Sequence, residues 1–183
     1  MAHLSIASCL DDVFARHATD TALSCNGARL SYRELEQRSA QVAARLLGLG
    51  LTPGSTLGLE VERSIEQLVL LVGMVRAGLS YCYLDRNNPP QWNQSVCERS
   101  GVRWRVTPEV AGGPGYLALD ELLAPTDEAA CWPPLCGAEP VYVNFSSGTT
   151  GAPKIIPCTH RGVLGFCDRC LLYTSDAADE EDS

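Results

Sequence analysis

Residues 55–84 read STLGLEVERSIEQLVLLVGMVRAGLSYCYL, and this stretch decides the fold class. Its two ends, residues 55–61 and residues 80–84, have the composition of short strands. Between them, Ser64 is a helix N-cap candidate and Gly78 is a helix stop. A helix that joins two strands through short links favours parallel pairing with a right-handed crossover. The stretch therefore predicts an α/β fold.

The helix inside this stretch has a recognisable start and a recognisable apolar face. Ser64 and Gln67 have the spacing of a capping box, in which each side chain bonds the other residue's backbone. Apolar residues recur at helical spacing and predict one buried face. That face comprises Ile65, Leu68, Val69, Val72 and Val75.

The first fifty residues predict a helix, a strand, a tight turn and a second helix. These elements are residues 8–18, residues 21–25, Asn26-Gly27 and residues 31–50. Ser31 and Glu34 form an S-x-x-E capping box for the second helix, with Leu30 and Leu35 as its hydrophobic staple. The apolar face of that helix comprises Leu35, Val42, Ala43, Leu46 and Leu47.

The alternation of strand and helix continues beyond residue 84 and then stops. A weaker helix is predicted up to Ser100, where Gly101 breaks it, and residues 102–106 (VRWRV) predict another strand. Residues 107–140 are rich in turn residues, with one short helix at residues 119–123 (LDELL). We expect a surface excursion there, within a single domain that has a mostly parallel sheet and flanking helices.

The composition excludes several classes of protein. Apolar residues make up 45% of the chain, which suits a globular protein, and no apolar run is long enough for a bilayer. The N-terminus lacks the basic region of a secretory signal, so we expect a cytoplasmic location. The formal charge is −8, but five of the acids lie in residues 170–183, and the rest of the chain has 17 acids against 14 bases. This balance predicts neither nucleic acid nor a membrane as partner.

The nine cysteines are many for a cytosolic chain. Cys167 and Cys170 form a CxxC with Cys158 and His160 nearby, a pattern that could indicate zinc. The other spacings are irregular, and a secreted context for disulfides is missing. Buried or incidental thiols explain the set better, so we expect no metal site.

Residues 144–154, NFSSGTTGAPK, contain the only lysine of the chain. The two glycines allow a loop whose successive N–H groups form an anion-binding nest, and Lys154 adds a mobile point charge. The hydroxyls of Ser146, Ser147, Thr149 and Thr150 add further donors. Strand-like segments flank the loop, so it differs from a Walker A loop, which leads directly into a helix. The segment predicts a polyphosphate site, with a plain turn and an incidental lysine as the alternative.

Thr159 follows the second of these flanking strands. Its hydroxyl can cap a helix that begins with HRGVLGF at residues 160–166.

Three segments, in order, resemble motifs of the adenylate-forming superfamily, which includes acyl-CoA synthetases and the adenylation domains of nonribosomal peptide synthetases. They are LSYREL at residues 30–35, MVRAGLSYCYLDRNNPP at residues 74–90 and YVNFSSGTTGAPKIIPCTHRGV at residues 142–163. The resemblance covers about residues 9 to 169 and is greatest to the N-terminal part of a peptide-synthetase adenylation domain.

The resemblance implies a role for each residue of the loop. The residues expected to wrap the phosphates of ATP are Ser146, Ser147, Gly148, Thr149, Thr150 and Gly151. Lys154 would be the catalytic residue that steadies the β- and γ-phosphates. Ser146 replaces the commoner Thr, and Ile155 replaces the usual Gly. Cys82 and Leu84 alter the second motif, whose expected role is structural.

The reaction implied is that of a carboxylic or amino acid with ATP, giving an acyl-adenylate and pyrophosphate. The acyl group then passes to a thiol of a carrier-protein phosphopantetheine or of CoA. Members of the family run much longer, and the Mg²⁺ ligand, adenine site and acid pocket are expected downstream. We therefore expect residues 1–169 to be the truncated N-terminal part of the large subdomain, inactive alone. A short non-catalytic protein that binds a nucleotide or a partner is the alternative.

Residues 170–183 are not expected to be native sequence of this protein. The codons TGT-CTC-TTA-TAC-ACA-TCT-GAC-GCT-GCC-GAC of a transposase-type sequencing adapter translate into Cys170 through Asp179 without a mismatch. We expect this tail to be an adapter artefact, which belongs outside fold reasoning. An ordinary acidic tail is the alternative.

Overall fold

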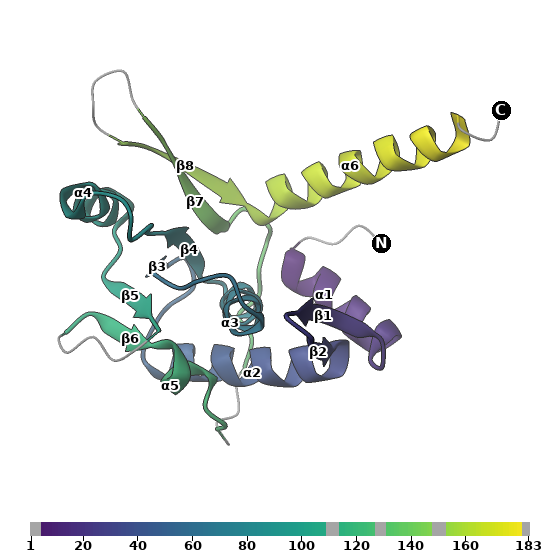
Figure 1. Ribbon diagram of the computed structural model, residues 1–183, viewed down its shortest axis with the longest axis horizontal. Coiled ribbons are helices and arrows are strands. Elements are labelled where there is room, and N and C mark those ends of the chain that lie inside the picture. Colours follow the sequence, from purple (N-terminus) through teal and green to yellow (C-terminus); the bar gives the residue numbers. More distant parts are fainter. Residues whose placement is uncertain (1–4, 109–113, 127–130, 148–152, 181–183) are drawn as a thin grey trace.

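A six-stranded sheet with the order β6-β5-β3-β4-β7-β8 organises the chain, as Figure 1 shows. The computed structural model describes residues 5–108, 114–126, 131–147 and 153–180. The strands are β3 (Thr56–Leu59), β4 (Ser80–Tyr83), β5 (Trp104–Thr107), β6 (Tyr116–Ala118), β7 (Pro140–Ser147) and β8 (Pro153–Thr159). The first five in sheet order pair in parallel, and β8 pairs antiparallel with β7. The predicted α/β fold with a mostly parallel sheet is confirmed.

Two helical crossovers build the centre of this sheet. Helix α3 (Ile65–Arg76) joins β3 to β4, and α4 (Pro90–Ser100) joins β4 to β5. Gly101 ends α4 in the left-handed conformation, at φ 68°. In the register, Thr56 lies opposite Ser80 and Leu59 opposite Tyr83, so the carboxyl ends of β3 and β4 are level.

The N-terminal part adds two helices and a hairpin beside the sheet. They are α1 (Ile6–His17), β1 (Thr21–Cys25), β2 (Ala28–Ser31) and α2 (Tyr32–Gly48). The turn between β1 and β2 has Asn26 and Gly27 at φ 50° and 83°, the two positive angles that a tight hairpin turn requires. The capping box of Ser31 and Glu34 is present in both directions, as predicted.

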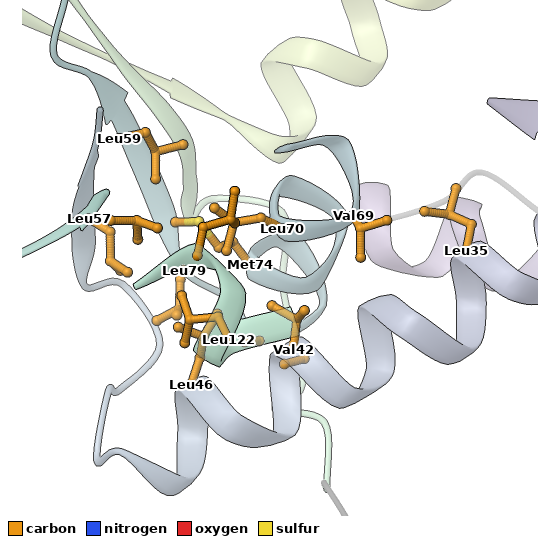
Figure 2. Packing of buried hydrophobic residues seen from close by; sticks show 14 of the residues in the cluster. Leu35, Val42, Leu46, Leu57, Leu59, Val69, Leu70, Met74, Leu79 and Leu122 are labelled. Carbon is orange, nitrogen blue, oxygen red and sulfur yellow. The ribbon is translucent and has the colours of Figure 1, made fainter. Parts of the chain in front are cut away.

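The core lies between α2, α3 and the sheet, and Figure 2 shows it from close by. Strand residues Leu57 and Leu59 face Leu70 and Met74 of α3, with Val42 of α2 beyond them (Figure 2). The predicted face of α2 is buried, apart from the half-buried Leu47. No helix in the described part of the chain has the length and apolarity needed to span a membrane.

The predicted surface excursion at residues 107–140 is wrong in part. Strand β6 pairs in parallel with β5 and is the edge of the sheet. The following helix α5 (Leu119–Leu123) buries Leu119 and Leu122 in the main core. A strand of three residues is too short to show alternation, and so the turn-rich flanks concealed it.

The predicted face of α3 also needs correction. Leu68 is 40% exposed, whereas Leu70 and Met74 are fully buried. Because α3 packs on the sheet and on α2 together, its buried arc is wider than a single helical stripe. The capping box is half formed: Ser64 accepts the N–H of Gln67, but the Gln67 amide donates to the Tyr83 hydroxyl.

The close approach of α3 to α2 at Gly73 gives a testable prediction. A Cβ at position 73 would lie 2.7 Å from both Cβ and Cγ1 of Val42 and 3.0 Å from the Ser39 carbonyl oxygen. We expect Gly73→Ala to lower the free energy of unfolding by about 1–2 kcal/mol, because overpacking outweighs the better helix propensity of Ala. Urea unfolding followed by circular dichroism measures this change.

Gly165→Ala is the matched control. A Cβ there meets nothing within 4 Å, so helix propensity alone acts and stability should rise by up to about 1 kcal/mol. Equal stabilisation by both substitutions would show that the two helices are not tightly packed at Gly73.

Candidate functional site

The predicted phosphate segment lies at the tip of the β7–β8 hairpin. Strand β7 is parallel to β4, with Tyr142 opposite Tyr81. Strand β4 ends two residues after Tyr81, whereas β7 continues five residues after Tyr142, to Ser147. The described ends of β7 and β8 therefore extend beyond the sheet at the carboxyl ends of β3 and β4 (Figure 1). In open α/β sheets this is the edge at which ligands bind.

The hairpin brings two of the predicted site residues together. Ser146 and Lys154 are directly opposite each other in the antiparallel ladder, so both side chains emerge on one face. Lys154 is exposed, and Ser147 lies opposite Pro153 at the end of the ladder. The other predicted residues, Gly148, Thr149, Thr150 and Gly151, lie outside the described residues. The predicted connection of two strands, rather than strand to helix, is confirmed.

The two faces of the hairpin have different surroundings. On one face, Val143, Phe145 and Ile155 pack against a second apolar cluster, which includes Cys82 and Leu84 of the altered motif and Val96 and Cys97 of α4. Burial raises the pKa of the Cys82 thiol to about 12, so it stays protonated and unreactive. This face anchors the hairpin, which agrees with the structural role expected for the altered motif.

The opposite face carries polar and aromatic residues together with the exposed Ile156. Successive pairs on this face are Tyr142 with Cys158, Asn144 with Ile156, and Ser146 with Lys154. Tyr81 of β4 lies beside Tyr142, with 5.9 Å between the ring centroids. The Lys154 ammonium is therefore on an accessible face, as a charge that meets a ligand from solvent must be.

A cleft of about 450 Å³ opens at the same edge of the sheet. Residues that follow β3 and β4 line it, among them Arg63, Asp85 and Arg86. At its wall, the Gln67 amide donates to the Tyr83 hydroxyl over 3.0 Å. Sequence reasoning missed this cleft. The sequence feature that could have predicted the cleft is the position of polar residues directly after the carboxyl ends of two neighbouring parallel strands.

Hydrogen bonds close the base of the hairpin. The Glu139 carboxylate accepts the N–H groups of Cys136 and Gly137 over 3.1 and 2.9 Å. The Cys136 thiol is 3.1 Å from the same carboxylate and, with these N–H groups, lowers the pKa of Glu139 to about 2. The backbone N–H of His160 donates to the Glu139 carbonyl, and that of Arg161 donates to the Gly137 carbonyl. The start of β7 and the end of β8 are thus tied together.

Helix α6 (His160–Glu180) begins directly after β8. The Thr159 hydroxyl accepts the N–H of Gly162 over 3.2 Å, so the predicted cap is confirmed. Cys167 and Cys170 lie exposed on α6. Within the described ranges, no group of His, Cys, Asp or Glu residues is placed to hold a metal ion.

Comparison with known proteins gives a consistent result. The family model for AMP-binding enzymes matches residues 10–183. Phosphinothricin tripeptide synthetase PhsB of Streptomyces viridochromogenes is 32% identical over 168 residues, which are 84% of this chain and 14% of the synthetase. The isonitrile lipopeptide synthase of Mycobacterium tuberculosis is 33% identical over 167 residues, which are 87% of this chain and 7% of the synthase. The chain thus spans a small part of the curated relatives it matches.

Two solved structures show the same architecture. PA1221, an NRPS protein containing adenylation and PCP domains, superposes with a TM-score of 0.81 at 30% identity, over 90% of this chain and 34% of that protein. The N-terminal subdomain of Klebsiella oxytoca NpsA, in complex with 3-hydroxybenzoyl-AMSN, has a TM-score of 0.80 at 24% identity. That match covers 88% of this chain and 42% of NpsA and shows a shared fold.

The Glu139 carboxylate gives a pH-dependent prediction for the hairpin base. Because its folded pKa of about 2 lies below the ordinary value of 4.5, it stabilises the fold above pH 4.5, and this stability is lost as the pH falls towards 2. Glu139→Gln should be less stable than the original chain at pH 7 and nearly equal to it at pH 2. Urea unfolding across this range measures the difference, and a stability gap that does not change with pH would contradict the prediction.

Proposed function

The chain belongs to the family of AMP-binding enzymes, and from that premise we propose that it is the N-terminal part of an ATP-dependent carboxylate-adenylating enzyme of the peptide-synthetase type. The observation that carries the proposal is the pair of half-buried Ser146 and exposed Lys154 beside the glycine-rich loop, at the carboxyl edge of the parallel strands. A hydroxyl, a mobile ammonium and loop N–H groups are suitable donors for a polyphosphate.

In the proposed reaction, a carboxylate oxygen of an amino or carboxylic acid attacks the α-phosphorus of ATP. The bond from the α-phosphorus to its bridging oxygen breaks, and pyrophosphate leaves with the negative charge. Lys154 stabilises this charge on the β- and γ-phosphates. Ser146, Ser147, Gly148, Thr149, Thr150 and Gly151 bind the phosphates and fix their orientation, which aligns the attack.

The family implies that Mg²⁺ binds together with the nucleotide. The chemistry of the side chains near Lys154 shows whether these residues could hold that ion. Mg²⁺ prefers carboxylate and water oxygens. On the face of the hairpin that carries Lys154, the described residues are neutral apart from the lysine itself. These residues suit phosphate and do not suit a divalent cation. We infer that the carboxylate ligand comes from another part of the protein.

The acyl group of the adenylate then passes to a thiol. A carrier-protein phosphopantetheine is the acceptor that the relatives favour, since PA1221 contains a PCP domain beside its adenylation domain. The thiol of CoA is the alternative acceptor within the family.

Lys154 provides the direct test. In the full-length enzyme, Lys154→Ala should slow carboxylate-dependent ATP–pyrophosphate exchange by about 100-fold, because one charge that acts in the transition state is lost. The melting temperature should hardly change, because the side chain is exposed. Arg99→Ala is the matched control: it removes an exposed cation from α4 and should leave exchange unchanged.

Undiminished exchange in Lys154→Ala would remove the proposed role of this lysine. The 183-residue chain alone should give no exchange, because the hairpin supplies one wall of the site. Robust exchange by the isolated chain would contradict the proposal that further residues complete the site.

We further propose that residues 170–183 derive from a sequencing adapter and not from the gene. The support is the ten-codon match from Cys170 to Asp179. Amplifying and resequencing source DNA across codon 169 should give a reading frame that continues for several hundred codons. Genomic DNA that encodes Cys170 to Ser183 followed by a stop codon would contradict this origin and favour the short binding protein.

A further inference from the structure

A buried histidine joins the N-terminal helix to the base of the phosphate hairpin. His160, the first residue after β8, is completely buried. Its Nδ1 accepts the backbone N–H of Ile6 over 3.2 Å, a contact across 154 residues of sequence. Its own backbone N–H donates to the Glu139 carbonyl. One residue therefore connects α1, β8 and the segment that leads into β7.

This contact defines the protonation state of the imidazole. Because Nδ1 accepts a hydrogen bond, the ring is neutral and its proton is on Nε2. Nε2 is buried without a hydrogen-bond partner among the described residues. Burial lowers the pKa of His160, and the charge of Glu139 opposes this to a smaller extent. An imidazolium has no acceptor, so protonation would break the contact with Ile6.

The other charged groups near this contact are engaged elsewhere or exposed. On α1, Asp11 lies 3.7 Å from the Arg76 guanidinium, and Asp12 accepts from Arg16. On α6, Arg161 is exposed to solvent. Glu139 is thus the charge that acts on the ring from the hairpin side.

Helix α1 is a fixed support for this contact. The Phe14 side chain is buried in the main core, and the Arg76 guanidinium lies 5.5 Å above its ring. At the start of the helix, Ser5 and Ser8 form a capping box. Ile6 is the first helical residue, and its N–H has no acceptor within the helix. His160 supplies that acceptor, and so the end of β8 is tied to the packed core.

We propose that His160 is a positioning residue, which holds the base of the β7–β8 hairpin against α1 and so places Lys154 for phosphate binding. Lys154 lies on β8, six residues before His160 and about 20 Å away at strand spacing. When the base of the hairpin is held in place, the direction of β8 is fixed, and with it the position of Lys154. This kinetic role rests on the proposed function, whereas the contact with Ile6 is independent of it.

Two substitutions in the full-length enzyme separate the hydrogen bond from simple packing. His160→Leu fills the space without an acceptor, whereas the amide oxygen of His160→Asn can take the place of Nδ1. In His160→Leu we expect KM for ATP in pyrophosphate exchange to rise roughly tenfold, with a smaller change in kcat. His160→Asn should stay within about twofold of the original enzyme. His17→Leu, which replaces an exposed histidine on α1, is the control and should leave KM unchanged.

Two further readouts test the mechanism. The Ile6 amide should exchange with deuterium faster in His160→Leu than in the original enzyme. As the pH falls below the ordinary value of 6.5, His160 becomes charged, and KM for ATP should rise. His160→Asn should lack this part of the rise, because its amide does not titrate.

Each outcome is informative about the proposal. Unchanged KM and unchanged Ile6 exchange in His160→Leu would overturn it. If His160→Leu does not fold, His160→Asn decides, and an acidic rise in KM identical to that of the original enzyme would overturn the proposal. Absence of exchange activity in the original enzyme would contradict the proposed function instead, and deuterium exchange at Ile6 would still test the contact.

Discussion

The packing of α3 between the sheet and α2 is the constraint on which the rest of the structure depends. Gly73 allows α3 to lie against Val42 of α2, while Leu70 and Met74 fill the space towards the strands. With α3 in this position, β3 and β4 pair level with each other, from Thr56 and Ser80 onwards. Their carboxyl ends then form one edge, and β7 extends that edge by pairing with β4.

The same packing fixes the elements that hold the hairpin. Arg76, at the end of α3, donates to the Glu36 carbonyl of α2 and lies above the rings of Phe14 and Trp132. A buried guanidinium is tolerated because these partners and Asp11 compensate its desolvation. Helices α1 and α2 and the segment before β7 therefore share one support. Contacts with the packed core therefore determine the position of the base of the hairpin.

Short sequence motifs correctly predicted the helix caps and the tight turn, which depend only on neighbouring residues. The Ser31–Glu34 box, the Asn26-Gly27 turn and the Thr159 cap need only a few neighbouring residues, and all three are confirmed. The prediction that the loop joins two strands is confirmed by β7 and β8, whereas the pairing of Ser146 with Lys154 was found only in the structure.

Contacts between residues that are far apart in the sequence could not be predicted from such short motifs. The Gln67 amide bonds Tyr83 because α3 packs on β4, and His160 accepts from Ile6 because two distant segments meet. Strand β6 forms by pairing in parallel with β5, whose outer edge would otherwise be unpaired. Nothing near these residues in sequence specifies their partners.

The described end of the β7–β8 hairpin carries one exposed positive charge, on Lys154. The last described pair of the ladder is Ser147 with Pro153, and a proline has no backbone N–H to donate. Lys154 comes next on β8, exposed and opposite a small hydroxyl. An arginine there would present a planar fork that suits one fixed geometry, whereas an ammonium on a flexible stem can follow phosphates as they separate. Under the role proposed for Lys154, a chain whose other basic residues are all arginine would have its one lysine where the cation has to move with the reacting groups.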